Sequence, residues 1–371
     1  MDTRIDWSDT AYTYVTEVAV VSQTNVNTIL GYLSGVQLSG MTVTENYNSD
    51  SRVQAKVSTV VAEGTSDGYV SDARLCFILL IPSRSWSEEL VTGYVTNYSE
   101  KSEHGYIKRD YTIEGTIWGL LNHKVDSLVS IGKGTGLIAT WNKLMGLTKM
   151  QYSSAGAQDH NWPDTTTYEA GTNLGTLLFE VSSGYNRMDT NGHGVVLLKK
   201  YVEPSIREAE YTIDFASLRG LAMSPLQKSF SKWEAPGRAI VTTTVSKEDK
   251  DGNTVQEVIT GSYDAPDTHF TSINTRGWLR GRLDSYTGAK DNPTKTDLEV
   301  EAKKNWEKSL SDSSVTWTAS SVFSDYHAGD VAMLITQGDA AKGNYTGRKV
   351  LLENVVTNLE NFTQDLTMKE V

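Results

Sequence analysis

The sequence contains a single cysteine among its 371 residues. Without a second thiol no disulfide can form within the chain, which excludes the cross-linked scaffolds typical of small secreted proteins. The cysteine, Cys76, lies in the apolar run ARLCFILLIP, where a thiol behaves as a small hydrophobic group. We therefore expect Cys76 to be part of the core and not a reactive group.

Long hydrophobic runs are also absent. The longest, LCFILLIP, is far shorter than the ~20 apolar residues that cross a bilayer, so we expect no membrane span. The first residues, MDTRIDWSDT, show no basic segment followed by an apolar one. For this reason we expect no ordinary export signal.

Positive charge is scarce relative to negative charge. Lys and Arg number 34 against 46 Asp and Glu, which gives a formal net charge of -12. A protein that binds nucleic acid as its main partner needs clustered Lys and Arg to displace counterions from the phosphates. The sequence has no long basic run, and this argues against such a partner.

Sequence motifs of catalysis and of metal binding are missing as well. There is no Gly-x-Ser-x-Gly elbow and no cysteine with an activating histidine nearby. The six histidines are scattered singly, without the spacing of zinc ligands, at His104, His123, His160, His193, His269 and His327. We therefore expect no enzyme activity, no metal site and no cofactor.

Two glycine-containing stretches resemble ligand-binding loops only in part. Gly132, Gly134 and Gly136 in IGKGTGLIA lack the Lys and Ser or Thr that follow the last glycine of a phosphate loop. They predict the N-terminus of a helix. The stretch DKDGN at 249–253 lacks the later Gly and Glu of a calcium loop, and it predicts the tip of a β-hairpin.

What the sequence does contain is mainly β structure. The first third alternates polar residues with Val, Thr, Ile and Tyr, as half-buried antiparallel strands do. Examples are TYVTEVAVVS, MTVTENY, SRVQAKVSTVVAEG, ARLCFILLIPS, EELVTGYVTNYSEK and GYIKRDYTIEGTI. Short strands at regular spacing suggest a barrel or sandwich. We predict a β-barrel-like domain over residues 1–116.

The next two regions differ in character. Residues 117–218 predict a mixed α/β insertion, with helices in TIWGLLNHKVDSLVS, GLIATWNKLMGL and NLGTLLFEVSS, followed by the strands GVVLLKKYV and AEYTIDF. Residues 219–371 predict a second β-barrel-like domain. This domain begins with a long hairpin on either side of DKDGN and has a helix over 294–310 that is capped by Thr or Asp.

A short motif near the C-terminal end carries a resemblance to a known family. The stretch VFSDYHAGDVAMLI is followed by a Gly- and Arg-containing loop and by VVTNLENFTQDLTMKEV. This arrangement resembles the tail-hub proteins of tailed bacteriophages, in which an aromatic-x-x-Gly-Asp-x-Val turn enters a barrel strand. The matching positions are Phe323, Tyr326, Gly329, Asp330 and Val331.

The resemblance implies a structural virion protein that is not an enzyme. Its two barrel-like domains would repeat around a homotrimer, forming a ring that meets a hexameric tail tube on one side and a three-fold spike or fibre on the other. The tape measure protein is a further implied neighbour, and DNA would pass the lumen without specific binding. The implied location is the tail tip or baseplate of the virion, after synthesis in the host bacterial cytoplasm.

Relatives often carry a C-terminal lysozyme or peptidase domain, and we expect any cell-wall cleavage to come from another protein. As candidate interfaces we suggest the hairpin at 246–256 and the loop at 336–348. The residues singled out there are Lys250, Asp251, Gly252, Asn253, Lys342, Gly343 and Asn344.

Two alternatives from other functional classes stay open at this point. The 9 Trp and 18 Tyr could furnish stacking platforms for a carbohydrate-binding adhesin, with Trp86, Trp141 and Trp162 as the residues to test. A cell-wall hydrolase could place its site around Asp159, His160 and Asp164, where imidazole and carboxylates lie close in sequence.

Overall fold

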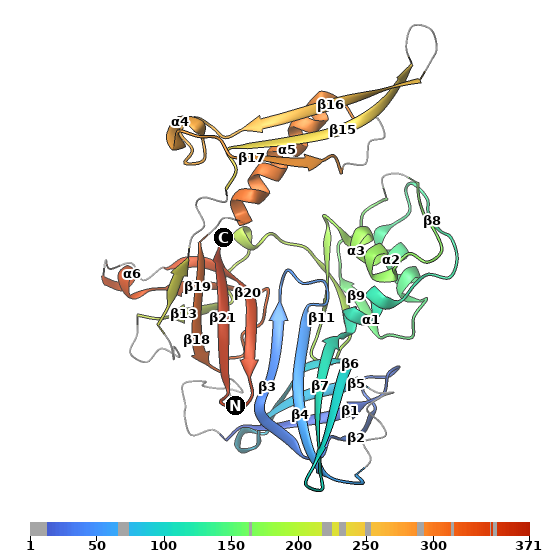
Figure 1. Cartoon of the computed structure of the whole chain (residues 1–371), viewed down its shortest axis with the longest axis vertical. Coiled ribbons are helices and arrows are strands. Elements are labelled where there is room, and N and C mark those ends of the chain that lie inside the picture. Colours follow the sequence, from blue (N-terminus) through green and yellow to red (C-terminus); the bar gives the residue numbers. More distant parts are fainter. Residues whose placement is uncertain are drawn as a thin grey trace. The chain divides into compact units, whose positions relative to one another are not determined.

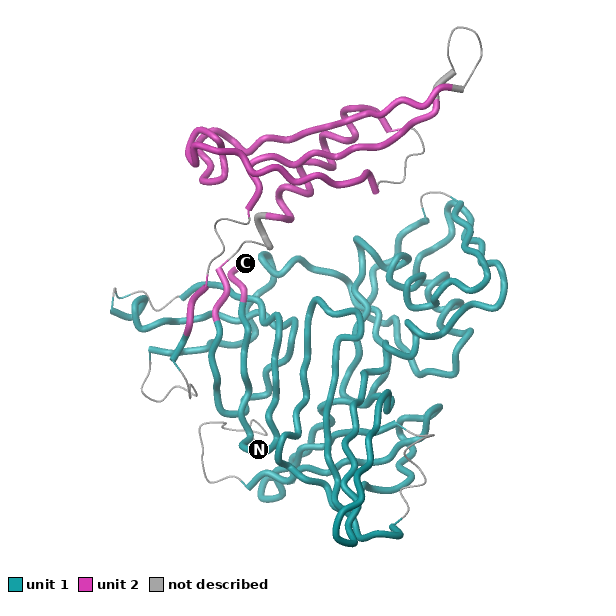
Figure 2. The backbone as a smooth tube through the Cα atoms, in the orientation of Figure 1, with its two compact units in different colours: residues 1–226, 318–368 teal, residues 227–317, 369–371 magenta. Residues whose placement is uncertain are grey.

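The computed structural model of the chain describes residues 13–65, 74–162, 165–216, 225–229, 235–248, 254–287, 293–312, 315–341, 343 and 347–371. It is mainly β, as the sequence predicts. The chain divides into two compact units (Figure 2). One comprises residues 1–226 and 318–368, and the other comprises residues 227–317 and 369–371.

The first unit is built on a large sheet that begins with seven strands. They are β1 (Val15–Val21), β2 (Ile29–Tyr32), β3 (Val36–Asn46), β4 (Val53–Ala62), β5 (Arg74–Ile81), β6 (Trp86–Glu103) and β7 (Tyr106–Gly115). Their order across the sheet is β3-β4-β7-β6-β5-β1-β2. The strand predictions for this region are confirmed, whereas β2, which is only four residues long, has no clear sequence pattern.

This part of the sheet curls around its own core. The chain passes from β2 at one end of the order over a short turn into β3 at the other end, and β1 contacts β3. Alternate residues of each strand point inward. The enclosed core includes Val18, Val43, Val57, Phe77 and Ile113, and Cys76 is buried as expected.

The closing strands of the chain belong to the same sheet. They are β18 (Thr316–Val322), β19 (Val331–Ile335), β20 (Arg348–Asn358) and β21 (Thr363–Glu370), with β13 (Tyr211–Asp214) parallel to β19. β20 pairs antiparallel with β3, from Asn354 opposite Asn46 to Asn358 opposite Thr42. The structure therefore differs from the expected division into 1–116, 117–218 and 219–371, because backbone pairing joins the last strands to the first barrel.

A small α/β region is inserted after β7, as predicted. It contains α1 (Thr116–Asn122), β8 (Val129–Ile131), α2 (Leu137–Met145), β9 (Tyr152–Gly156), β10 (Thr166–Tyr168), α3 (Leu174–Ser182), β11 (Asn186–Thr190) and β12 (Val196–Lys200). Its own core contains Ile117, Leu120, Trp141, Leu177 and Leu198. The glycine-rich stretch at 132–136 leads directly into α2, which confirms that prediction.

The first of the three predicted helices is shorter than expected. Periodicity predicts a helix that reaches Leu128, but α1 ends at Asn122 and Leu128 is 64% exposed. From His123 onward the backbone bonds instead to the segment that precedes α3: Leu174 N donates to His123 O at 2.7 Å and Val125 N to Thr172 O at 3.0 Å. These bonds replace those of a longer helix.

The second unit contains the predicted hairpin and helix. Its elements are β14 (Gln227–Ser229), β15 (Arg238–Glu248), β16 (Thr254–Asp264), α4 (Ile273–Arg276), β17 (Gly281–Ser285) and α5 (Lys295–Asp312). β15 and β16 form an antiparallel hairpin, and α5 covers one face of this sheet (Figure 1). Thr294 and Asp297 cap α5 reciprocally: Thr294 N donates to the carboxylate at 2.8 Å, and Asp297 N donates to Thr294 Oγ1 at 3.3 Å.

Three short helical segments complete the described chain: η1 (Pro82–Arg84), η2 (Pro204–Ile206) and α6 (Gln337–Ala341). In the part of the chain that the structure describes, every helix is too short or too polar to cross a bilayer.

Candidate functional site: the turn before β19 and the adjacent cleft

The motif singled out in the sequence forms the turn between β18 and β19, residues 323–330. Phe323 at its start is buried in the core of the curled sheet, where its ring meets that of Tyr14 edge-on at 6.4 Å between centroids. Val331 at its end is fully buried as the first residue of β19. The two apolar ends therefore anchor the turn in the first unit.

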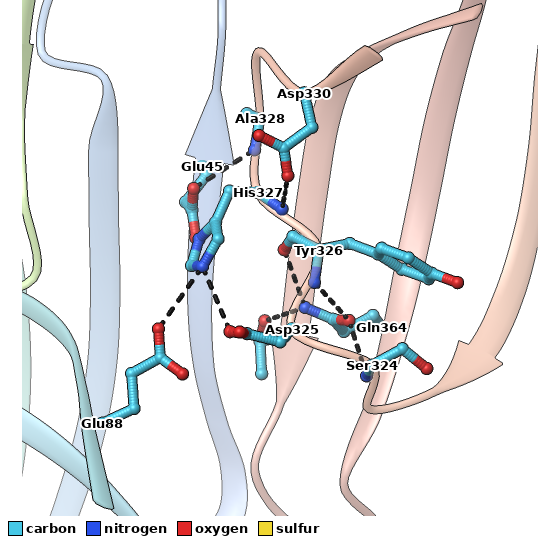
Figure 3. Close-up of polar contacts among 10 residues, drawn as sticks. Glu45, Glu88, Ser324, Asp325, Tyr326, His327, Ala328, Asp330 and Gln364 are labelled. Carbon is cyan, nitrogen blue, oxygen red and sulfur yellow. Dashed lines mark hydrogen bonds and ion pairs between the residues drawn. The ribbon is translucent and has the colours of Figure 1, made fainter. Parts of the chain in front are cut away.

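A buried glutamine of β21 holds the middle of the turn (Figure 3). Gln364 Oε1 accepts hydrogen bonds from Ser324 N at 3.1 Å and Tyr326 N at 3.3 Å, and its Nε2 donates to Tyr326 O at 2.9 Å. Gln364 Nε2 also donates to Thr357 Oγ1 of β20 at 3.2 Å. One side chain thus satisfies three backbone groups in the middle of the turn, at Ser324 and Tyr326.

Gly329 and Asp330 shape the end of the turn. Gly329 has φ of +103°, and a Cβ there would lie 2.9 Å from Cδ2 of Tyr47, so both the backbone and the space favour glycine. The Asp330 carboxylate accepts a hydrogen bond from His327 N at 2.9 Å. Burial raises the pKa of Asp330 to about 7.

Within the turn, the His327 imidazole faces three carboxylates, two of which come from distant strands (Figure 3). His327 Nδ1 lies 2.9 Å from Glu45 Oε1 of β3. Its Nε2 lies 3.2 Å from Asp325 Oδ1 and 3.5 Å from Glu88 Oε1 of β6. The nearby charge of Glu45, and then hydrogen bonds to Asp325, Glu45 and Glu88, raise the pKa of His327 well above its ordinary value.

Glu45, Glu88 and His327 of this group line a cleft of about 630 Å³ within the first unit. The rest of its lining is mixed in charge, with Arg52, Arg187, Arg207, Lys199 and Lys200 facing Glu89, Asp189 and Glu210. Tyr47 stands in the wall, its ring covered by the Arg187 guanidinium at 3.4 Å from the centroid. The cleft leaves no pattern in the sequence, because its residues come from the barrel, the insertion and the closing turn.

The residues suggested as interfaces are only partly placed. Lys250, Asp251, Gly252, Asn253, Lys342 and Asn344 lie outside the described residues. Gly343 is described: it has φ of +72°, with open space where a Cβ would be. The hairpin and the loop therefore stay predictions as interfaces.

The tryptophans suggested for sugar stacking have other partners. Trp141 is fully buried in the insertion, and Trp162 is half-buried there with its indole N–H donating to Thr166 Oγ1 at 3.1 Å. Trp86 packs against the core of the curled sheet. Full burial excludes the Trp141 ring as a stacking platform, and the other two rings are each partly buried against a core.

The suggested hydrolytic residues also have structural contacts. The Asp159 carboxylate accepts hydrogen bonds from Ile138 N and His160 N, each at 3.0 Å, and so caps the first turn of α2. The His160 ring stacks on Tyr185 at 3.9 Å between centroids. Asp164 lies outside the described residues.

Comparisons with known proteins give no match to a family model and none among curated sequences. Solved structures do match. The tail protein of Neisseria meningitidis aligns with a TM-score of 0.64 at 11% identity and 97% coverage of both chains. The 43 kDa tail protein of prophage MuSo2 from Shewanella oneidensis gives 0.64 at 9% identity, over 96% of this chain and 98% of that one.

A third match is a component of the E. coli type VI secretion system that is structurally similar to bacteriophage T4 tail proteins gp27 and gp5. It aligns with a TM-score of 0.51 at 10% identity, over 98% of this chain and 76% of that one. At such identities the likeness establishes the fold. The chain has the fold of phage tail proteins, over nearly its whole length.

Proposed function

We propose that the chain is a structural tail protein, a homotrimeric hub that joins a hexameric tail tube to a three-fold spike or fibre. The observation that carries the proposal is the likeness to two tail proteins, which extends over at least 96% of this chain at a TM-score of 0.64. A likeness of this extent includes the barrel, the insertion and the second unit together. It supports a shared role for the whole chain.

The exposed edge of the large sheet fits a subunit that assembles. Within the described residues β2 is the last strand of the sheet order, paired only with β1. It exposes Ile29, Leu30 and Tyr32, with 49%, 45% and 54% of their surface accessible. A sheet edge that is both unpaired and apolar is prone to pair with a neighbouring chain.

The residues suggested for a hydrolase or an adhesin have structural roles, which also supports the proposal. Asp159 caps a helix, His160 stacks on a tyrosine, and Trp141 is fully buried. These roles explain the residues without catalysis or glycan binding. The net charge of -12 favours a hub that lets DNA pass, because an acidic surface repels phosphates.

The direct test is the mass of the purified chain by light scattering over a wide concentration range. We expect a species of three times the 40.9 kDa chain mass. A dimer or a tetramer would contradict a three-fold hub.

A second experiment tests the location independently of the trimer. Antibodies against the chain, coupled to gold, are applied to phage-like particles purified from the bacterium that carries the gene, and viewed by electron microscopy. We expect label at the end of the tail farthest from the head. Label on the head, or along the whole tail, would contradict the proposed place in the tail.

A further inference from the structure

Three side chains at the cleft come close enough together to share one metal ion. His327 Nε2, an Asp325 oxygen and a Glu88 oxygen all lie within 4.8 Å of one another. We propose that Glu88, Asp325 and His327 bind a divalent transition-metal ion such as Zn²⁺. The proposal goes beyond the hub function, and it stands or falls independently of it.

The distances between the three groups support a shared ion. Metal bonds of roughly 2.0–2.2 Å to nitrogen and oxygen place neighbouring ligand atoms about 3.0–3.5 Å apart. The imidazole Nε2 lies 3.2 Å from Asp325 Oδ1 and 3.5 Å from Glu88 Oε1. Both separations therefore fit adjacent positions around one ion.

The other ring nitrogen is held as it is in many metal sites. Nδ1 of His327 lies 2.9 Å from Glu45 Oε1, and Glu45 has only 14% of its side chain exposed. A ligating histidine usually donates its second N–H to a carboxylate, which fixes the ring and makes the free nitrogen a better donor to the metal. In this arrangement Nδ1–H donates to Glu45, and Nε2 faces Asp325 and Glu88.

A proton on Nε2 of His327 would not be enough to pair with the carboxylates that face it. Nε2 can carry one hydrogen, yet two carboxylates face it, and a hydrogen bond at 3.5 Å is beyond the usual range. With three carboxylates around one imidazole, even a protonated ring leaves two negative charges uncompensated. A divalent ion in place of the Nε2 proton would leave only one, and it would bind all three atoms at once.

The ligand set indicates which ions fit. Imidazole and carboxylate together suit Zn²⁺ and its neighbours, whereas Mg²⁺ prefers oxygen ligands and retained waters. Asp325 and His327 are each about a third exposed, so water could occupy the remaining positions. The ion would tie the turn at 323–330 to β6, two segments that are distant in the sequence.

The experiment is a calorimetric titration of the chelator-treated full-length protein with zinc chloride. We expect one Zn²⁺ per chain, and no comparable heat with magnesium chloride. Glu88→Gln should weaken zinc binding more than tenfold, because even loss of an outer-shell partner costs about 10–100-fold. Glu45→Gln, which removes the partner of Nδ1, should weaken zinc binding by about 10–100-fold.

The matched control is Glu89→Gln, which removes the same charge from the next residue. Glu89 also borders the cleft, but it faces His193 at 3.2 Å. Circular dichroism would confirm that each variant is folded, and we expect the zinc affinity of Glu89→Gln to equal that of the wild type. Failure of the wild type to bind one equivalent, or equal affinities of the Glu88→Gln and Glu89→Gln proteins, would overturn the proposal.

Discussion

Gly329 combines two constraints that can be separated by substitution. Its φ of +103° disfavours any side chain, and its missing Cβ leaves room for the Tyr47 ring. Gly171 has a similar φ of +91° with open space around it. Gly171→Ala should therefore lower the free energy of unfolding only by the cost of the left-handed backbone conformation, about 1–2 kcal/mol. Gly329→Ala should lower it distinctly more, as measured by urea unfolding. Equal losses would mean that the tyrosine ring moves aside freely.

Asp339 predicts a pH dependence of stability. Hydrogen bonds from Thr336, together with one from Arg348, lower the pKa of Asp339 from 3.8 to about 2. Because the folded pKa is depressed, the carboxylate stabilises the folded state above pH ~4, and this contribution is lost as the pH falls toward 2.

The corresponding experiment compares the wild type with Asp339→Asn by thermal melting at several pH values. The variant should melt at a lower temperature at pH 7, and the difference should shrink as the pH falls from about 4 to 2. A difference that is the same at every pH would show that the Asp339 charge contributes no stability.

At the level of elements, Gln364 connects β21 to the turn that leads into β19. Its amide serves three backbone groups of the turn and Thr357, and it is almost fully buried. Gln364→Met keeps the length of the side chain but leaves these groups without partners. We expect a loss of at least about 1–3 kcal/mol in the free energy of unfolding.

The control for this substitution is Gln37→Met on β3. The Gln37 amide makes one exposed hydrogen bond, to Gly35 O at 3.1 Å, so its loss should change the free energy of unfolding by less than about 0.5 kcal/mol. Similar losses at the two positions would contradict the role of Gln364 as the anchor of the turn.

The sequence predicts local elements well because their patterns are local. The alternation in β4 and β7, the glycine before α2 and the Thr294 cap of α5 all depend on residues a few positions apart. The pairing of β20 with β3 joins residues more than 300 positions apart, and nothing in either strand specifies that partner. The sequence therefore predicts a separate barrel for the last strands.

The same reason explains why the sequence does not predict the group formed by Glu88, Asp325 and His327. Each histidine stands alone in the sequence, and His327 meets Glu45 and Glu88 only after the sheet has formed. The motif at 323–331 was found because its residues are contiguous. Its partners Gln364 and Tyr47 cannot be predicted in this way. The motif itself contains no sign of a hydrogen bond to a distant glutamine or of contact with a distant ring.

For the whole molecule, the edge strand β2 allows a test of assembly that rests on the proposed trimer. Leu30 is 45% exposed in this strand, and Leu30→Lys places a charge where a neighbouring chain would pair. Burial of an unpaired ammonium costs at least ~1.4 kcal/mol, so association should weaken by roughly tenfold or more. Light scattering at several concentrations measures the shift from trimer toward monomer.

Leu147 provides the matched control, because it is 52% exposed but follows the end of α2 and lies outside any sheet edge. Leu147→Lys removes the same apolar side chain and adds the same charge, so the two variants have equal net charge and equal long-range repulsion between chains. A trimer that is weakened only by Leu30→Lys would locate the contact at β2. Equal weakening would attribute the loss to charge alone, and no weakening would exclude β2 from the interface.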